Sequence, residues 1–561
     1  MGITACFILF VTSTTGVNIT EPVDGETYNG DWLTVRAIVE NENEIPEHVQ
    51  YSLNGQPVLL IPRLNTDWYT YMQDDLHRGF SESPAPTDNT ILWTAPVTGD
   101  YHEFPTPVIV DGIVYYPSNY GTDSLYALDA ATGELIWKYR VGMTDDAVTV
   151  KNGYLYTASD SVWCLDALTG ERIWANGDAD WNGSTPAVVD GRVYCGRANY
   201  YTSYIYCFDA VTGTEIWSET LSGYTASCLT VWNDMVFIPT YNGSLYAMDS
   251  NTGSNIWENT DSYQGYWDSS PVVVDNLIYI SGFDSKTRAI DAMTGTTVWE
   301  TDITPGTYIS ATPAYYDGRL YFGDQVDKYH CLDASTGSAI WSVPGVQHGS
   351  SGIADGMVFY GEGSNYYDES ARVFALNCET GQEVWSYTTS AGQFGIVSCP
   401  AITDGVVYIA ATDWNLYAFG TGLKYTYLDD LFADVGSNEL IVTSFDDGVP
   451  VAADTISFTV TGTGISLEPS HQLALCASPN PFHFSASISF ELSEPGYTSI
   501  EVYDLSGRVI CSLNDSDLAA GTHTVNWDGR KQNGESVSAG LYFCRIQSGN
   551  ITETTGLCLL R

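Results

Sequence analysis

Close variants of the segment Ala127-Leu-Asp-Ala-Ala-Thr-Gly-Glu-Leu-Ile-Trp137 return along most of the chain. Its glycine recurs at positions 133, 170, 213, 253, 295, 337 and 381. Intervals of 37 to 44 residues are typical of repeat proteins, in which each unit buries its apolar surface only against its neighbours. The sequence therefore predicts an array of similar units.

Each unit contains four segments of strand length, which in the third unit are 185–189, 192–196, 203–209 and 214–219. A two-residue turn of Asn, Asp or Gly separates the first two segments in all eight units. Such pairs suit the positive backbone angles of a type I′ hairpin. The turns are 111–112, 152–153, 190–191, 233–234, 275–276, 317–318, 355–356 and 404–405.

The eighth unit, 400–422, has three strands and lacks the strand that carries the tryptophan. The missing strand is available at 90–94, because Ile91-Leu-Trp93-Thr matches Glu215-Ile-Trp217-Ser. Pairing the two ends would remove the open edge that a ring otherwise has. We therefore expect an all-β, eight-bladed β-propeller closed by an N-terminal strand.

Composition agrees with many short strands and excludes one class of partner. The chain has 561 residues, with 13% aromatic and 16% charged residues and 52 glycines, which favours strands and tight turns over helices. Its formal net charge of −49 repels phosphate backbones and anionic lipid surfaces. We therefore expect no nucleic-acid partner.

The twelve cysteines follow the repeat rather than a disulfide framework. Cys164, Cys207 and Cys331 occupy the position held by Ala127 and Ala247 in other units, which indicates small buried packing residues. The sequence contains no Cys-x-x-Cys, so neither a zinc nor a thioredoxin-like site is supported.

The repeated pattern Ala-x-Asp-x-x-Thr-Gly-x-x-x-Trp resembles the tryptophan-docking motif of pyrroloquinoline quinone (PQQ) dehydrogenases and of the cofactor-free propeller that assists outer-membrane protein assembly. The resemblance implies that these tryptophans lock neighbouring blades by stacking, with each indole N–H bonded to backbone. Asn377 replaces the aspartate in the seventh unit, which we expect to weaken the motif there. The docking residues are Trp93, Trp137, Trp174, Trp217, Trp257, Trp299, Trp341 and Trp385.

The segment Asp67-Trp68 to Gly79 resembles the lead-in that precedes quinoprotein-type propeller repeats. It contains His77, which we interpret as a residue that pins the lead-in to the propeller rather than as a ligand. Residues 17–62 and 423–463 each resemble part of a bacterial Ig-like domain, with Asn54-Gly55 as a hairpin turn. Because the propeller closure brings 90 and 420 together, we expect one Ig-like β-sandwich interrupted by the propeller.

The last 84 residues carry Pro479-Asn-Pro-Phe482, Tyr503-Asp-Leu-Ser-Gly507, Trp527-Asp-Gly529 and Gly540-Leu-Tyr542. These motifs resemble the C-terminal Ig-like sorting domains of type IX secretion cargo and the related flagellar hook-capping fold. The resemblance implies export across the outer membrane. The apolar run 3–11 is similar in length to a signal-peptide core, and we expect no transmembrane span.

The expected domains are a signal-peptide remnant, two halves of an Ig-like domain around the propeller, a linker and a C-terminal Ig-like sorting domain. The signal-peptide remnant is 1–16. The two halves of the Ig-like domain are 17–72 and 423–463, and the propeller between them is 73–422. The linker is 464–477 and the sorting domain is 478–561.

The two faces of the predicted propeller differ. We call the face with the Asp-Gly and Thr-Gly turns the turn face, and the opposite face, with irregular loops, the loop face. Loops that vary are the usual place for function, so we expect a site on the loop face. The loops of this face that lie far from the channel, the outer loops, include Asp284 and Asp324. Candidate ligand-binding residues, which enter the innermost strands and should ring the channel mouth, are His102, Glu103, Trp181, Asn182, Tyr266, Trp267, Asp268, Tyr308 and His348.

Aromatic side chains interleaved with carboxylates and amides suit a polar ligand with apolar faces, such as a glycan or a peptide. The alternative is that these aromatics only fill the channel. We assign no catalytic residue and no metal ligand. The sequence favours a secreted or cell-surface binding protein of a Gram-negative-type bacterium, with a glycan, peptide or protein ligand and with export machinery as partner of the C-terminal domain.

Two other functions stay open. One is a PQQ-dependent dehydrogenase, although such enzymes typically carry an adjacent Cys-Cys pair that this sequence lacks, and calcium ligands cannot be mapped onto these blades. No cofactor is therefore predicted, neither PQQ nor calcium. The other is a scaffold propeller in an envelope protein complex.

Overall fold

The computed structural model divides the chain into two compact units, Met1–Gly462 and Thr463–Arg561. The residues that the structure describes are 16–21, 27–29, 32–41, 48–53, 56–61, 66–97, 105–118, 123–142, 147–176, 184–199, 202–225, 227–262, 265–266, 269–303, 306, 308–345, 349–362, 371–390, 396, 398–432, 436–446, 449–461, 476–478, 486–492, 496–503, 509–527, 529–531, 537, 540–548 and 551–559.

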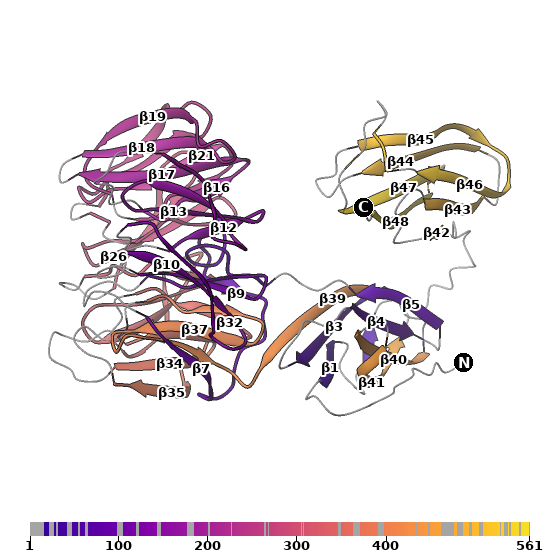
Figure 1. Ribbon diagram of the computed structural model, residues 1–561, viewed down its shortest axis with the longest axis horizontal. Helices are drawn as coiled ribbons and strands as arrows, with labels where there is room; N and C mark the ends of the chain where they lie inside the picture. The colour runs from indigo at the N-terminus through magenta and orange to yellow at the C-terminus, as the bar shows by residue number, and fades with distance from the viewer. Residues whose placement is uncertain are drawn as a thin grey trace. The chain divides into compact units, whose positions relative to one another are not determined.

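The predicted all-β class is confirmed, since the described residues form strands and no α-helix. The described part of residues 66–424 contains eight sheets, arranged as a β-propeller (Figure 1). We number them in chain order, each from its innermost strand. Sheet 1 comprises β8 (Val108–Val110), β9 (Ile113–Ser118), β10 (Ser124–Asp129) and β11 (Leu135–Arg140), and sheet 2 comprises β12 (Thr149–Lys151), β13 (Tyr154–Ala158), β14 (Val162–Asp166) and β15 (Arg172–Asn176). Sheet 3 comprises β16 (Ala187–Val189), β17 (Arg192–Asn199), β18 (Thr202–Asp209) and β19 (Glu215–Ser222). Sheet 4 comprises β20 (Thr230–Trp232), β21 (Met235–Pro239), β22 (Leu245–Asp249) and β23 (Asn255–Asn259).

Sheets 5 to 8 follow the same order, with two additions from the N-terminal side. The short strand β6 (Phe80–Ser81) joins sheet 7 in parallel, and β7 (Ile91–Pro96) joins sheet 8. Sheet 5 comprises β24 (Val272–Val274), β25 (Leu277–Ser281), β26 (Lys286–Asp291) and β27 (Thr297–Asp302), and sheet 6 comprises β28 (Ala314–Tyr316), β29 (Arg319–Gly323), β30 (Lys328–Asp333) and β31 (Ala339–Pro344). The other strands of sheet 7 are β32 (Gly352–Ala354), β33 (Met357–Gly361), β34 (Ala371–Asn377) and β35 (Glu383–Thr389). Those of sheet 8 are β36 (Ala401–Thr403), β37 (Val406–Ala411) and β38 (Asn415–Phe419).

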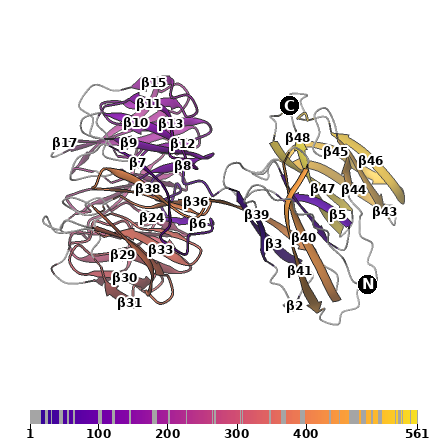
Figure 2. The same cartoon turned by 60° about the horizontal axis from the view of Figure 1, so that its bottom comes forward.

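The closing strand pairs where the sequence places it. β7 lies antiparallel beside β38 (Figure 2), with Trp93 opposite Ala418 and Thr94 opposite Tyr417. At the innermost level β36 of sheet 8 contacts β8 of sheet 1. The N-terminal strand therefore completes the last sheet, and no half-finished sheet edge faces solvent there.

The docking tryptophans form the predicted joints. Each indole N–H donates a hydrogen bond of 2.8–3.1 Å to a backbone carbonyl of the following sheet, and the last one reaches the segment before β7. The pairs are Trp93–Ala130, Trp137–Ala167, Trp174–Ala210, Trp217–Ser250, Trp257–Ala292, Trp299–Ala334, Trp341–Cys378 and Trp385–Pro86. Eight joints thus run from sheet to sheet around the whole ring.

The motif glycine is required by this joint. Gly253 has φ +75°, and a Cβ placed on it would lie 2.8 Å from the ring of Trp217. A larger residue would suffer both the left-handed backbone and a clash with the indole. The aspartate four residues before the glycine shapes the same turn, since Asp249 Oδ1 accepts from the N–H and the hydroxyl of Thr252.

Asn377 gives the same turn without a charge. Its Oδ1 accepts from the backbone N–H of Glu379 and Thr380 and from the Thr380 hydroxyl, at 2.9–3.0 Å. The hydrogen bonds of the seventh unit are therefore all present, against the expectation of a weaker motif there.

A second joint residue was not predicted. In sheets 1, 2, 3, 6 and 8 a tyrosine of the second strand donates to the same carbonyl as the docking tryptophan, as Tyr156 does to Ala210 at 3.2 Å. Because one carbonyl oxygen has two lone pairs, both donors are satisfied at once. Each of these joints is therefore a pair of aromatic donors around one acceptor.

The remaining strands of the first unit form two further sheets. One has the order β1 (Gly16–Glu21), β3 (Trp32–Asn41) and β39 (Leu423–Phe432), and the other β2 (Thr27–Asn29), β41 (Val449–Thr461), β40 (Gly436–Asp446), β4 (His48–Leu53) and β5 (Gln56–Ile61). β3 pairs with β39 from Trp32 opposite Phe432 to Asn41 opposite Leu423 (Figure 2). Strands from before and after the propeller thus share both sheets.

The second unit has its own core. Its sheets are β42 (Cys476–Ser478), β43 (Ala486–Leu492) and β46 (Gly521–Trp527), and β45 (Val509–Leu518), β44 (Gly496–Tyr503), β47 (Gly540–Ser548) and β48 (Ile551–Leu559). Phe490, Ile500, Val502 and Trp527 are buried together in this unit. Among the described residues of the chain, no helix is long and apolar enough to cross a membrane.

The prediction for the cysteines of the repeat is confirmed. Cys164, Cys207 and Cys331 are free thiols with none of their surface exposed. Burial raises the pKa of the Cys207 thiol to about 11, so the thiol stays protonated at neutral pH.

Candidate functional site

The channel of the propeller is closed by the lead-in, which we define as Thr66–Ser83. Its backbone bonds to the innermost strands of sheets 1, 2, 5, 6 and 7 in turn, for example from Val150 N–H to Tyr69 at 2.8 Å. Thr66 and Ser83 bond to sheet 8 through Thr403 and Gly405. The segment therefore lies across the channel at the level of the innermost strands and begins a few residues before the expected propeller boundary at 73.

The middle of the lead-in fills the channel. The Tyr71 hydroxyl donates to Thr312 Oγ1 at 3.0 Å and lies 2.7 Å from Ser350 Oγ. Met72 is fully buried, with its sulfur 3.5 Å from the Cys399 thiol. A ligand of the propeller must therefore approach the channel from the loop face.

His77 pins the lead-in, as expected. Its Nδ1 lies 2.9 Å from the Thr230 hydroxyl of sheet 4, and the side chain is 3% exposed. Burial lowers the pKa of His77 to about 4, against the opposing effect of Asp74. The imidazole is therefore neutral at physiological pH and holds the lead-in to sheet 4 without a charge.

Two of the nine candidate ligand-binding residues lie within the described part of the chain, Tyr266 and Tyr308. Tyr266 is fully buried, and its hydroxyl has no hydrogen-bond partner among the described residues. Tyr308 is 49% exposed on the loop face. Outside the described residues lie His102, Glu103, Trp181, Asn182, Trp267, Asp268 and His348.

The side chain of Tyr266 lies near charged residues that are buried from solvent. Arg288 is fully buried, donates from Nη1 to Asp284 Oδ1 at 3.0 Å, and donates to the Asp261 carbonyl at 3.3 Å. Burial raises the pKa of the Tyr266 hydroxyl, although Arg288 opposes this. Asp284, expected in an exposed outer loop, is thus half of a buried ion pair in the wall of sheet 5.

Sheet 6 repeats this arrangement with a histidine. His330 Nδ1 lies 3.0 Å from the Ser342 hydroxyl, and Nε2 lies 3.3 Å from Asp324 Oδ2. Burial alone would raise the pKa of Asp324, but His330 and three backbone N–H groups lower it. The other sheets have an aromatic residue at the position of Arg288 and His330, namely Tyr126, Trp163, Tyr206, Tyr246, Phe374 and Tyr417.

Aromatic pairs lie on the loop face of sheets 4 to 6. Tyr224 and Tyr241 have ring centroids 4.5 Å apart, and Phe283 and Tyr308 lie 4.9 Å apart. In each pair the ring of one outer loop lies against a residue that enters an innermost strand. The pairs leave partly exposed apolar surface beside polar loop atoms.

A cavity of about 440 Å³ opens on the loop face between sheets 1 and 2. It is lined by Asp123 and Arg140 of sheet 1, which form an ion pair at 2.8 Å, and by Asp160 and Trp163 of sheet 2. The indole N–H of Trp163 points to the Asp160 carboxylate at 3.2 Å. An aromatic ring, a guanidinium and two carboxylates thus converge on one opening.

Glycine shapes this cavity. A Cβ on Gly142, which has φ +97°, would lie 2.7 Å from the Asp160 carboxyl carbon. The backbone of sheet 1 therefore approaches the Asp160 carboxylate as closely as only glycine permits. Sequence reasoning missed Asp123, Arg140, Asp160 and Trp163, because they stand at strand ends rather than in the segments that enter the innermost strands.

Comparison with known families agrees with this geometry. Residues 83–179, 158–303 and 283–421 match the PQQ_2 family, described as outer membrane protein assembly factor BamB, and together they span more than half of the chain. The chain belongs to this PQQ_2 family. A separate match, to the FlgD Ig-like domain, covers residues 482–550.

Several solved structures share the fold of this propeller. The quinohemoprotein alcohol dehydrogenase of Comamonas testosteroni is 16% identical with a TM-score of 0.53, covering 66% of this chain and 82% of that one. A europium-containing methanol dehydrogenase is 13% identical with a TM-score of 0.51, covering 65% and 98%. Identities this low show the fold alone. No curated protein matches the chain.

The quinone PQQ carries several carboxylates, so a site for it in the channel needs compensating cations. Around Tyr71 the described groups are hydroxyls and thiols, with His77 held neutral. Among the described residues, no group of three or more His, Cys, Asp or Glu side chains is placed to hold a metal ion. The described channel residues therefore do not fit the quinone and its metal.

Proposed function

We propose that this PQQ_2 propeller is a binding protein that recognises a glycan on its loop face. The observation that carries the proposal is the cavity lined by Asp123, Arg140, Asp160 and Trp163. Closure of the channel by the lead-in supports it, because a ligand can then enter the channel from the loop face but not from the turn face.

The chemistry of the cavity suits a sugar. Carboxylates such as Asp123 and Asp160 accept hydrogen bonds from hydroxyl groups, and Arg140 donates to ring or hydroxyl oxygens. The indole of Trp163 offers an apolar surface to the C–H face of a pyranose. Its volume of about 440 Å³ is within the range of small-ligand sites, roughly 300–1,000 Å³.

Glycan-array binding of the full chain tests the proposal. Wild-type protein should bind a defined set of glycans, and Trp163→Ala should weaken that binding about tenfold or more, as expected for an aromatic anchor. Tyr206→Ala, at the equivalent position of sheet 3, is the matched control and should bind like wild type. Absence of glycan binding by the wild type, or equal binding by Trp163→Ala, would overturn the proposal; binding to a peptide array alone would assign the face to peptides.

The C-terminal unit supports a location outside the cytoplasm. We propose that residues 478–561 direct export to the cell surface, in view of the FlgD Ig-like match at 482–550. In the producing bacterium, deletion of these residues should leave the protein inside the envelope, where fractionation would find it. Unchanged surface exposure of the truncated chain would contradict this role.

The family description favours one second candidate, a scaffold in an envelope protein complex. Cross-linking in the producing bacterium separates the two, since a scaffold would retain its partner in the Trp163→Ala variant. For the dehydrogenase alternative, a new visible absorbance on addition of quinone and calcium would be the deciding sign.

A further inference from the structure

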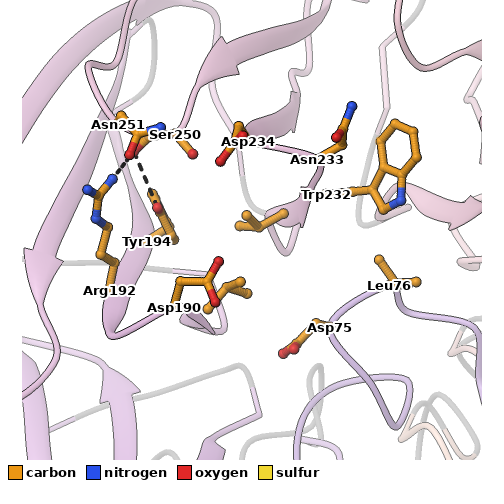
Figure 3. Close-up of a pocket in the computed structure, with 12 residues that line it drawn as sticks. Asp75, Leu76, Asp190, Arg192, Tyr194, Trp232, Asn233, Asp234, Ser250 and Asn251 are labelled. Atoms are coloured by element: carbon orange, nitrogen blue, oxygen red, sulfur yellow. Dashed lines mark hydrogen bonds between the residues drawn. The ribbon is translucent and has the colours of Figure 1, made fainter. Parts of the chain in front are cut away.

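We propose that a second cavity, on the turn face between sheets 3 and 4, binds an alkylammonium or alkylguanidinium group, as carried by lysine and arginine side chains. The cavity measures about 330 Å³, and Asp75 and Leu76 of the lead-in close its third side (Figure 3). It lies on the opposite face from the proposed glycan site. Failure of the glycan proposal would therefore not affect this second proposal, and the reverse holds as well.

One part of the cavity wall is apolar. Leu76, Val189, Val231 and Trp232 line it together, and Trp232 is half-buried. An alkyl chain of three or four methylenes gains from contact with such a wall. The indole adds attraction for a cation placed over its face.

The nearby cations are already engaged. Lys151 Nζ donates to Asp75 Oδ2 at 2.5 Å and to the Val188 carbonyl at 2.9 Å. Arg192 Nη1 donates to the Ser250 carbonyl at 3.0 Å, one of the two dashed contacts in Figure 3. Lys151 is therefore directed to Asp75, whereas Arg192 attracts Asp190 across a longer distance, with no ion pair between the two among the described residues.

Two carboxylates remain for a ligand. Asp190 and Asp234 approach the cavity from the turns of sheets 3 and 4 (Figure 3). No hydrogen bond or ion pair joins either side chain to another described residue. In a protein of net charge −49, the surrounding field further raises the local concentration of cations.

The residues that build this cavity depart from the repeat. Asp234 takes the second turn position, where six of the eight turns have glycine, although its φ of 59° is one that glycine adopts more easily. Trp232 takes the last position of the innermost strand, which is valine in sheets 1, 3 and 5. Sheet 4 thus places an indole and a carboxylate together at two positions that the other sheets fill with different residues, most often valine and glycine.

The repeat also supplies substitutions that preserve the turn. Asp234→Gly copies the other turns, Trp232→Val copies the other strands, and Asp190→Asn copies Asn152 of sheet 2. Asp275→Asn, at the first turn position of sheet 5, is the matched control away from the cavity. All four variants should therefore fold as the wild type does.

Calorimetric titration of the full chain with acetyl-lysine amide and acetyl-arginine amide tests the proposal, with acetyl-norleucine amide as the uncharged control. The two charged probes should bind and the control should not. Asp234→Gly and Trp232→Val should each weaken binding about tenfold, whereas Asp275→Asn should leave it unchanged. Binding should also weaken as salt is raised, since exposed charges are screened.

A free diamine, 1,5-diaminopentane, distinguishes the sources of the ligand. Tighter binding of the diamine than of acetyl-lysine amide would assign the cavity to small organic amines, and weaker binding to side chains of a protein partner. The proposal is overturned if neither charged probe binds, if acetyl-norleucine amide binds equally, or if Asp234→Gly and Trp232→Val bind as wild type does.

Discussion

The indole nitrogen of Trp385 donates a hydrogen bond of 2.9 Å to the carbonyl oxygen of Pro86, 299 residues earlier in the chain. This contact joins sheet 7 to the segment that precedes the closing strand β7. All other joints of the ring connect segments 30 to 37 residues apart. Closure of the propeller therefore depends on a contact between its two ends.

Loss of this closing hydrogen bond should destabilise the propeller. Trp385→Phe keeps an aromatic ring but leaves the Pro86 carbonyl without its donor, which should cost about 1–2 kcal/mol of unfolding free energy. Urea denaturation followed by circular dichroism measures the change. Trp163→Phe serves as control, because its N–H bonds to Ser159 and Asp160 within the same sheet and joins no two sheets. An equal loss in both variants would contradict a special role of the joint.

The motif glycines should differ sharply from the turn glycines of the first hairpins. In Gly253→Ala the new methyl group would meet the Trp217 ring, whereas at Gly153, with φ +79°, nothing lies within 4 Å of a Cβ. Gly153→Ala should cost only the left-handed backbone, about 1 kcal/mol, and Gly253→Ala should cost clearly more. Thermal unfolding of the two variants measures the difference. Similar melting temperatures would show that the Trp217 ring can move away from the new methyl group at little cost, which would contradict the prediction.

The aspartates of the repeated turn should tolerate an amide but not an alanine. Asp209 accepts from the N–H and the hydroxyl of Thr212 at 2.8 Å, and Asn377 makes the same contacts in sheet 7. Asp209→Asn should therefore unfold like wild type, while Asp209→Ala should lose about 1 kcal/mol. Chemical denaturation at pH 7 of both variants provides the test.

The same turn predicts a sensitivity to acid. Hydrogen bonds from the Thr212 backbone and side chain lower the pKa of Asp209. Its stabilising effect is therefore present above the pKa of the unfolded chain and is lost as the pH falls through the lower folded value. Asp209→Asn should lose less stability than wild type between pH 5 and pH 2; a parallel decline would exclude the turn as a source.

His77 predicts a change in a different pH window. Its pKa, lowered by burial to about 4, is below the value of about 6.5 in an unfolded chain. Between these values the unfolded chain binds a proton that the folded protein does not, so stability falls by up to about 3 kcal/mol as the pH drops from 7 to 4. His77→Gln should show a smaller decline in that window when urea denaturation is repeated across the pH range, whereas an unchanged decline would place the proton elsewhere.

Much of the fold could be predicted because the residues that make each contact recur in nearly every unit of the repeat. Seven glycines before seven tryptophans fix the joints, and the absent fourth strand of sheet 8 identifies Trp93 as its replacement. The path of Thr66–Ser83 around the channel could not be predicted, since this segment occurs once and its contacts reach residues up to 338 positions away.

The candidate site was harder to predict for a related reason. An acidic residue in a loop is usually exposed, yet Asp284 and Asp324 are buried because Arg288 and His330 replace aromatic residues three positions before the motif aspartate. That substitution of a cation for an aromatic is visible in the sequence once the units are aligned. The cavity beside Trp163 has no such signal, because it arises from how two sheets meet.

Hydrogen exchange of the full chain with and without a bound glycan reports which face of the propeller a ligand protects. We expect slower exchange in β14 and at the end of β11, around Trp163 and Arg140, and no change in the turns of sheets 3 and 4. Protection confined to the turn face, or spread evenly over the ring, would contradict recognition at the loop face.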